Sequence, residues 1–251
     1  MATLLNDNRQ PILSARGLRK RFDGVVALDS LDIDIEDGIT GVVGPNGAGK
    51  TTLFDVLSGF SRPDSGTVLL CGRRVNGWPP HRLARQHPGI TRSFQEIRLF
   101  EELSVLDNVL VARKFSGGTT VWGIMRRLTI RRELRKELNE VLKILRLLEL
   151  ADLQQRRAHE LSYGQRKLLE LGRCLAAESR LTLLDEPFAG VNPHMIELIC
   201  RALTKARDGS QKAFLLVDHN RRAMESVCDR ILRMEQGRVV GAVTGGQAHV
   251  A

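Results

Sequence analysis

The chain has 251 residues, of which 42% are hydrophobic and 4% aromatic, enough for one large domain or for a core with a smaller lobe. Lys and Arg outnumber Asp and Glu by 38 to 29, and the net charge of +9 favours an anionic partner such as nucleotide, nucleic acid or an anionic membrane face. Nowhere do about 18 consecutive apolar residues occur, and the N-terminus lacks the pattern of a signal peptide, so neither a membrane span nor secretion is expected.

Three short strands are predicted at the front of the chain, over residues 12–22, 25–35 and 39–43. Asp23-Gly24 separates the first two and predicts a hairpin turn. Phe22 stands just before this turn. A core position is the default for such a residue, and its place also leaves it free to stack on a base.

The next segment, Gly44-Pro45-Asn46-Gly47-Ala48-Gly49-Lys50-Thr51-Thr52, matches the phosphate-binding template of a glycine, four residues, then Gly-Lys-Thr. It lies between a predicted buried strand and a predicted helix over 50–58, which is the setting that this motif needs. Glycines let backbone N–H groups curl around phosphate oxygens, and a helix N-terminus adds partial positive charge. Lys50 is predicted to reach the β- and γ-phosphates and Thr51 to bind Mg²⁺. A Gly-rich turn that happens to contain a lysine is the alternative.

The sequence pattern predicts several short elements in the middle of the chain. They are a strand over 67–71, a helix over 81–86, a strand over 89–94 ending at Gln95, a helix over 104–114 with Ser104 as N-cap, a linker over 115–120 and an amphipathic helix over 127–150. Gln95 is uninformative by itself. The basic run at 126–132 is interpreted either as a solvated face or as a contact for anionic lipid head groups.

Leu161-Ser162-Tyr163-Gly164-Gln165 precedes a helix predicted to run to about residue 177, with Ser162 as its N-cap. Capping explains the serine but leaves Gly164 and Gln165 unexplained, because glycine weakens a first helical turn. A glycine there permits an anion to approach the exposed N–H groups of the helix N-terminus.

A buried strand over 181–185 leads to two adjacent carboxylates, Asp185 and Glu186, which Pro187 follows. Because adjacent side chains on a strand point to opposite sides, the two acids can take two roles. Asp185 is predicted to hold hydrated Mg²⁺ and Glu186 to polarise water. Simple solvated charges are the alternative.

In the last third, Asn192 is predicted to cap a helix over 193–208, and a strand over 213–217 ends at His219. A lone histidine is more often a surface residue, but this one lies at the edge where open parallel sheets place ligands. A hairpin over 227–243 and a mobile tail over 244–251 complete the chain. The scattered cysteines are expected to be free, mostly buried thiols of a reducing compartment; they are Cys71, Cys174, Cys200 and Cys228.

The order of these motifs, together with residues 189–192, resembles the ATP-binding cassette (ABC) ATPases over about residues 12–243. The resemblance implies an α/β fold of the P-loop NTPase kind. It would have a RecA-like core with a mostly parallel sheet, an antiparallel β subdomain and an α-helical signature subdomain. The core and the β subdomain would take residues 12–95 and 178–243, and the helical subdomain about 96–177.

The resemblance also implies a role for each motif, with ATP and Mg²⁺ as cofactors. Phe22 would stack on adenine, and Asn46, Gly47, Ala48, Gly49, Lys50, Thr51 and Thr52 would cradle the phosphates. Mg²⁺ would be held by Thr51, Gln95 and Asp185, with Glu186 as general base and His219 as a γ-phosphate contact. Ser162, Gly164 and Gln165 would bind the γ-phosphate held by a second subunit. Two cassettes packed head to tail, identical or different, are therefore implied.

A subfamily is indicated by residues 91–100, by Tyr163 in the signature and by residues 189–193, which are similar to the ATPases of branched-chain amino-acid importers. This implies transmembrane permease subunits, a periplasmic or extracellular binding protein and a place on the cytoplasmic face of the inner membrane. Residues 186–191 and 218–220 also look like the lipopolysaccharide-export ATPase, and a urea or amide importer is close as well.

A nucleic-acid-linked cassette ATPase is the alternative from a different class, and it would suit the charge of +9. Translation factors of that kind have two cassettes in one chain, and the repair proteins insert a long coiled coil between loop and signature. Here there is one cassette, and only about 110 residues separate Lys50 from Ser162. No nucleic-acid partner is expected.

Overall fold

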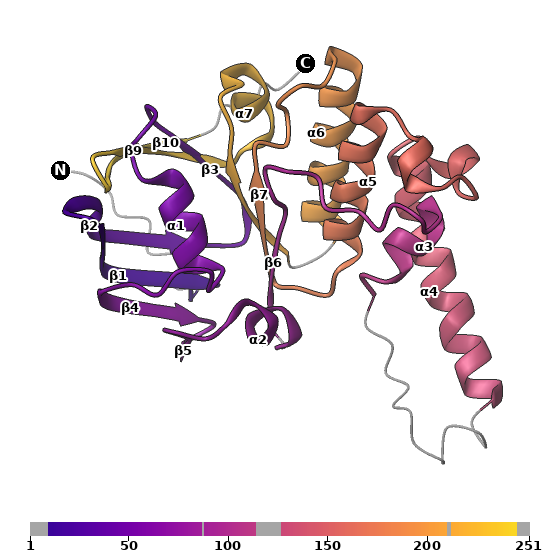
Figure 1. Cartoon of the computed structure of the whole chain (residues 1–251), viewed down its shortest axis with the longest axis horizontal. Helices are drawn as coiled ribbons and strands as arrows, with labels where there is room; N and C mark the ends of the chain where they lie inside the picture. The colour runs from indigo at the N-terminus through magenta and orange to yellow at the C-terminus, as the bar shows by residue number, and fades with distance from the viewer. Residues whose placement is uncertain (1–9, 87, 114–126, 210–211, 245–251) are drawn as a thin grey trace.

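A computed structural model describes residues 10–86, 88–113, 127–209 and 212–244, without the side chains of residues 127–133 and 244. The strands, in chain order, are β1 (Leu13–Phe22), β2 (Val25–Ile35), β3 (Gly38–Val43), β4 (Ser65–Leu70), β5 (Arg73–Arg74), β6 (Ile90–Arg92), β7 (Leu181–Asp185), β8 (Ala213–Val217), β9 (Arg230–Glu235) and β10 (Arg238–Thr244). The helices are α1 (Lys50–Leu57), α2 (Pro80–Arg85), α3 (Val105–Leu110), α4 (Arg127–Leu147), α5 (Tyr163–Ala176), α6 (Pro193–Gly209) and α7 (Arg221–Val227). Figure 1 shows two sheets beside a group of helices.

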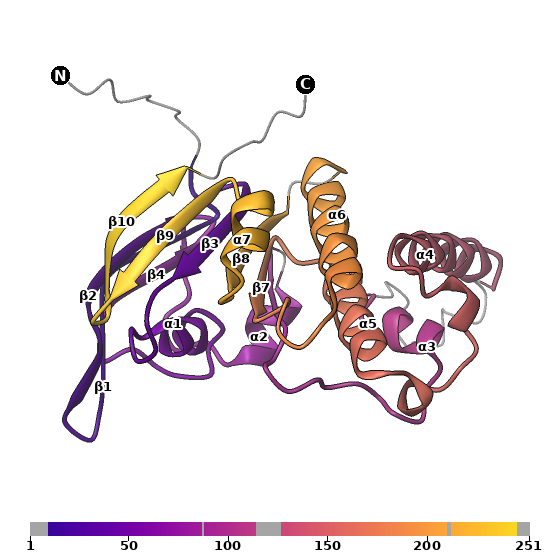
Figure 2. The ribbon, with the colours of Figure 1, turned by 90° about the horizontal axis from the view of Figure 1, so that it is seen from above.

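The larger sheet has the strand order β10-β9-β3-β8-β7-β6, and only β10 runs antiparallel to its neighbour. Every residue of β7 and β8 is buried, as expected for parallel strands that helices cover on both faces. Figure 2 shows α1 and α7 on opposite sides of this sheet. The predicted core with a mostly parallel sheet is confirmed.

The smaller sheet is antiparallel, with the order β2-β1-β4-β5. Its first hairpin turns at Asp23 and Gly24, which have φ values of 43° and 91°. A two-residue turn with positive φ at both positions matches the twist of the strands that it joins, and Asp-Gly adopts it readily. The predicted hairpin is therefore confirmed.

The helical part of the chain packs α3 and α4 against α5, on the right in Figure 1. The apolar stripe predicted for α4 is buried only toward its C-terminal end, where Val141 and Leu145 of the helix and Leu148 just after it are fully enclosed. Leu134, in the same predicted stripe, is 44% exposed because this end of α4 extends beyond its partners. The N-terminal basic run at 126–132 and the linker at 115–120 lie outside the described side chains.

Several predicted boundaries are wrong. Helix α7 was not predicted, and Val227, expected to begin a strand, is its last residue. Asn220 begins α7 by accepting a hydrogen bond from the Ala223 N–H at 3.1 Å, a cap that the apolar pattern did not reveal. The helix capped by Ser104 ends at Leu110. Strand β6 pairs with β7 over three residues only, so it is shorter than predicted.

The four cysteines are free, as predicted. Cys174 and Cys228 are buried, Cys200 is half-buried and Cys71 is exposed. Burial raises the pKa of Cys174 and of Cys228 to about 12, which keeps both thiols protonated.

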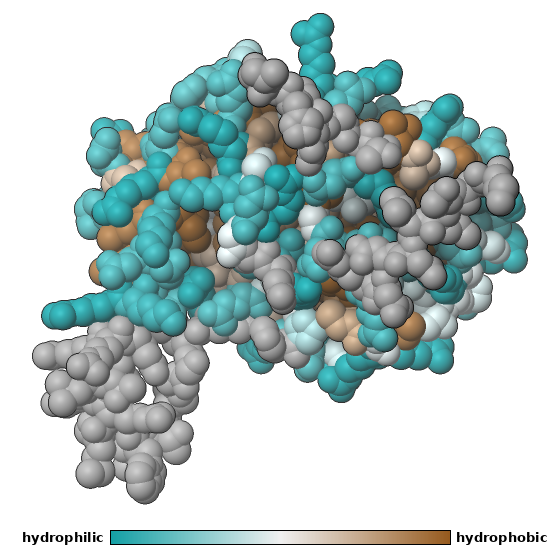
Figure 3. All heavy atoms as spheres, turned by 180° about the vertical axis from the view of Figure 1, so that it is seen from behind, coloured by the Kyte–Doolittle hydropathy of each residue, from teal (hydrophilic) through white to brown (hydrophobic). Residues whose placement is uncertain are grey.

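Within the described ranges, every helix is too short or too polar to cross a membrane. Figure 3 shows the face opposite to that of Figure 1, where apolar surface is interspersed with hydrophilic side chains. Thr244, predicted to begin a mobile tail, is instead the last residue of β10, and the rest of that tail, residues 245–251, lies outside the described residues.

Candidate functional site

The phosphate-binding motif forms the loop between β3 and α1. A Cβ atom on Gly44 would lie 2.1 Å from the Met234 carbonyl oxygen, and one on Gly49 would lie 2.2 Å from that of Ala27. Only glycine fits at these two positions. Gly49 also precedes α1 with φ 96° and provides no side-chain cap, so the first N–H groups of the helix are left for another acceptor.

Lys50 folds back over this loop. Its Nζ atom donates to the carbonyl oxygens of Gly44 at 2.8 Å and Pro45 at 3.0 Å. Burial lowers the pKa of Lys50, while the nearby charges of Glu186 and Asp185 oppose that shift. The remaining loop side chains differ in exposure: Asn46, Gly47 and Thr51 are exposed, Thr52 is half-buried and Ala48 is buried.

Asp185 ends β7 and is held from two sides by the segment before Gln95. Its carboxylate accepts a hydrogen bond from Arg92 Nη2 at 3.2 Å, and its N–H donates to Ser93 Oγ at 3.0 Å. Among the described residues, none forms a hydrogen bond with the other carboxylate oxygen, Oδ1. Gln95 itself is exposed, two residues after Ser93.

Glu186 lies beyond the strand, and its φ of 50° is left-handed. The predicted alternation of the two acids along one strand is therefore wrong, because the chain turns between them. The Glu186 N–H donates to the Val217 carbonyl at 2.8 Å, and Oε1 lies 3.6 Å from Nε2 of His219. The structure thus brings His219, from the loop after β8, to the carboxylate of Glu186.

A divalent ion fits this arrangement. No cluster of three or more His, Cys, Asp or Glu side chains capable of holding a metal occurs in the described part of the chain. Mg²⁺ does not need one, since it is usually bound by one or two carboxylates together with substrate phosphates and water. Asp185 Oδ1 and the exposed Thr51 hydroxyl are oxygen ligands of the required kind.

Phe22 is 48% exposed, so the default expectation of a core position is wrong. The Nζ atom of Lys20 lies 5.1 Å from the centroid of its ring. An exposed aromatic face with a cation beside it suits stacking on a base.

The signature segment forms a capping box at the start of α5. Ser162 Oγ accepts from the Gln165 N–H at 3.3 Å, and Gln165 Oε1 accepts from the Ser162 N–H at 3.0 Å. A Cβ on Gly164 would lie 2.2 Å from the Met195 sulfur. Local packing therefore accounts for Gly164 and Gln165, for which the sequence suggested only an approaching anion.

Arg92 is a site residue that the sequence analysis did not identify. Its side chain is 8% exposed, and its guanidinium joins Asp55 at 2.6 Å to Asp185. Three phenylalanine rings surround it, each with its centroid 5.6 Å away. An arginine inside a predicted strand was the available signal, because a buried cation requires a partner.

The chain matches the family model described as "ABC transporter" over residues 28–189, more than half of its length. The chain belongs to the ABC transporter family. The cassette is 35% identical over 230 residues to the high-affinity branched-chain amino acid transport ATP-binding protein BraF of Pseudomonas aeruginosa, covering 91% of this chain and 89% of the relative. It is 34% identical to LivG of Escherichia coli K12, with the same coverage.

Solved structures agree with this assignment. A nucleotide-free ATP-binding cassette from an ABC transporter matches with a TM-score of 0.78 and 30% identity, covering 95% of this cassette and 93% of that chain. The structure of an ATP-binding cassette in its ADP conformation matches with a TM-score of 0.78 and 31% identity, covering 94% of this cassette and 92% of that chain. The cassette is thus an ATPase with a P-loop NTPase fold that binds adenine nucleotides.

Proposed function

We propose that this cassette hydrolyses ATP to power import of branched-chain amino acids across the cytoplasmic membrane. One observation supports the enzymatic part above all: three separate segments of the chain meet at the C-terminal edge of the larger sheet, and they contribute Lys50, the adjacent Asp185 and Glu186, and His219. The names of BraF and LivG, at 34–35% identity, support the substrate class.

Nucleotide binding follows from the loop geometry. The N–H groups of the loop and of α1 surround phosphate oxygens, and Lys50 exchanges its loop carbonyls for the β- and γ-phosphates. Phe22, with its exposed ring, stacks on adenine. Thr51, Asp185 and Gln95 would hold Mg²⁺, which when bound supplies charge neutralisation for phosphoryl transfer.

Glu186 is the general base in this proposal. Its left-handed backbone turns it away from Asp185, so one carboxylate is available for water while the other serves the metal. His219, at 3.6 Å from Glu186, is placed to contact the γ-phosphate beside the same water. Proton transfer to a positioned carboxylate contributes about 10²- to 10⁴-fold to rate.

In this proposal, the signature of one cassette forms part of the nucleotide site of the other cassette. Ser162, Gly164 and Gln165 lie at the start of α5, a helix N-terminus that favours an anion. One chain has one phosphate loop and one signature, so a head-to-tail dimer makes two complete sites. We infer peripheral association with permease subunits at the cytoplasmic face and dependence on an extracytoplasmic binding protein.

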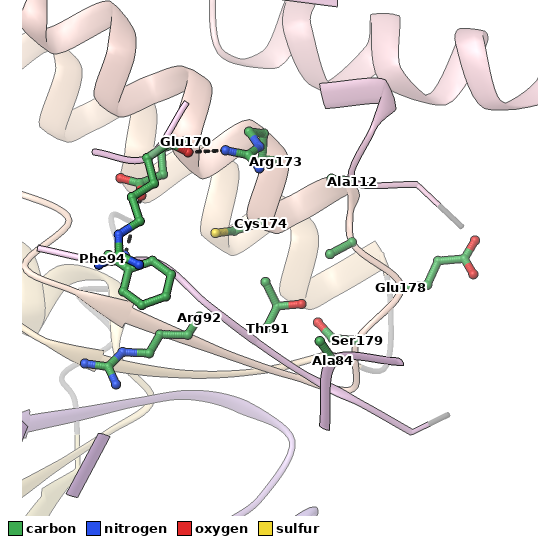
Figure 4. Close-up of a pocket in the computed structure, with 12 residues that line it drawn as sticks. Ala84, Thr91, Arg92, Phe94, Ala112, Glu170, Arg173, Cys174, Glu178 and Ser179 are labelled. Carbon is green, nitrogen blue, oxygen red and sulfur yellow. Dashed lines mark hydrogen bonds between the residues drawn. The ribbon is translucent and has the colours of Figure 1, made fainter. Parts of the chain in front are cut away.

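The docking surface for the permease is proposed at residues 96–112. Next to it a cavity of about 230 Å³ opens between α5 and β6, lined by side chains from both (Figure 4). Phe100 and Val111 of this segment are 48% and 53% exposed, a high value for apolar side chains. Glu101 and Glu102 form ion pairs with Arg166 and Arg157, so reversing their charges would disturb the cassette itself.

Val111→Asp is therefore the sharper test of this surface. The carboxylate would have to be desolvated in an apolar contact, so we expect at least about a tenfold loss of assembly with the permease. Hydrolysis by the isolated cassette should stay within about twofold of wild type, the usual range for a surface substitution. Pull-down with the permease subunits measures the first quantity, and full assembly of the variant would contradict the proposed surface.

The function itself is tested by reconstituting the cassette with its permease subunits and measuring ATPase activity with candidate binding proteins. Stimulation by a binding protein loaded with leucine, isoleucine or valine is expected. Stimulation only by lipid-export partners, or only by a urea- or amide-loaded binding protein, would overturn the substrate class and keep the ATPase.

A further inference from the structure

Helix α5 contains a buried lysine that neither the motifs nor the proposed chemistry uses. Lys167 is 8% exposed, and its Nζ atom donates to the backbone carbonyl of Glu186 at 2.7 Å. Burial lowers its pKa, and four acidic groups around it oppose that shift: Glu170, Asp218, Glu186 and Asp185. The ammonium group therefore lies at the centre of the acidic end of β7 and β8.

The hydrogen bond from Lys167 reaches the backbone at a residue with an unfavourable conformation. Glu186 has a φ of 50°, a region that non-glycine residues rarely adopt. Such a conformation persists only when its surroundings hold it. Here the N–H of Glu186 donates to the Val217 carbonyl, and the Glu186 carbonyl accepts from Lys167 at 2.7 Å and from the Ala189 N–H at 3.2 Å. Lys167 provides the side-chain contact among these three bonds, which together hold the backbone that orients the carboxylate.

One turn later on α5, a second buried charge contacts the other catalytic segment. Glu170 is 8% exposed, and its Oε1 accepts from the Phe94 N–H at 3.5 Å. Burial raises the pKa of Glu170, and hydrogen bonds from the backbones of Phe94 and Arg98 oppose that rise. Both Glu170 and Phe94, the residue before Gln95, are labelled in the lining of the cavity in Figure 4.

We propose that Lys167 and Glu170 are positioning residues through which α5 fixes Glu186 and the Gln95 segment. The proposal rests on the head-to-tail dimer, in which the first residues of α5, Ser162 to Gln165, contact nucleotide in the partner's site. A rigid helix then joins the signature of one composite site to the general base of the other. Engagement of the signature by nucleotide is transmitted along α5 to Glu186.

The decisive variant is Lys167→Met, which keeps the length of the side chain but removes its charge and its donor. We expect kcat for ATP hydrolysis to fall about 10- to 100-fold, since small misplacements of catalytic groups have effects of this size. KM for ATP should stay within about twofold, because Lys167 does not contact the phosphate loop. Lys167→Arg, which can still donate to the carbonyl, should recover most of the loss.

Lys212, the residue before β8, provides a matched control at the other end of α5. Its side chain is half-buried, with a pKa lowered by burial to about 8, and it donates to the carbonyls of Leu175 at 2.7 Å and Ala177 at 2.6 Å. Lys212→Met should lower the melting temperature and leave kcat within about twofold, because it removes a helix C-terminal contact far from Glu186. Equal kcat losses in the two variants would reduce Lys167 to a structural role and overturn the proposal.

Amide hydrogen exchange tests whether nucleotide binding at the signature is transmitted along α5 to Glu186. With a non-hydrolysable ATP analogue, wild type should show slower amide exchange both at 162–168 and at 185–190. In Lys167→Met we expect the slowing at 162–168 to persist and that at 185–190 to be lost. Unchanged slowing at 185–190 would contradict the proposal. Absence of nucleotide binding or hydrolysis in wild type would instead contradict the proposed function.

Discussion

Glu186→Gln is expected to slow ATP hydrolysis about 10²- to 10⁴-fold, the usual contribution of a general base. The amide cannot accept the proton from water, whereas its shape and its backbone contacts to Val217 and Lys167 are retained. ATP binding should persist, because the side chain lies beside the loop and does not form it.

Single-turnover hydrolysis and equilibrium binding of a fluorescent ATP analogue measure these two quantities separately. Glu197→Gln, the same change at an exposed position of α6, is the matched control and should hydrolyse at the wild-type rate. If Glu186→Gln hydrolysed ATP as fast as that control, Glu186 would not be the base.

Lys50→Ala is expected to weaken nucleotide binding about 10²-fold, the equivalent of roughly 3 kcal/mol for lost hydrogen bonds to a charged group. The ammonium group is the only cation that the described structure places over the loop, at 2.8 Å and 3.0 Å from two of its carbonyls. In the nucleotide complex its charge offsets that of the phosphates, and alanine cannot replace it.

Isothermal titration with ATP provides the measurement, with thermal unfolding as a check that the variant is folded. Lys143→Ala, which removes an exposed lysine paired with Glu140 on α4, is the matched control. Unchanged ATP affinity in Lys50→Ala would show that the lysine only stabilises its own loop and does not bind nucleotide.

Much of the fold was predictable because its signals are local. Asp23-Gly24 specifies a hairpin by its own φ preferences, and the loop over 44–52 is defined by spacing. The caps at Ser104, Ser162 and Asn192 were also predicted, since each needs only one side chain and a nearby N–H. Helix α7 is seven residues long, so its apolar pattern was too short to identify.

The sequence was sufficient to predict most residues of the candidate site, but not the contacts between them. Spacing located Asp185, Glu186 and His219, whereas the turn between the two acids depends on a positive φ that no side-chain pattern reveals. Arg92 and Lys167 were missed because their roles depend on contacts with residues that are distant in the sequence. Their partners lie 93 and 19 residues away in the chain, and only the folded structure brings them together.

The capping box at the start of α5 uses the side-chain oxygens of the signature as hydrogen-bond acceptors and leaves the side-chain donors available. Ser162 Oγ and Gln165 Oε1 use their acceptor sites on each other's backbone N–H groups. A hydroxyl retains its proton and an amide its two N–H bonds when their oxygens accept in this way. The segment therefore still offers one O–H and two N–H donors to an approaching oxyanion before any second cassette arrives.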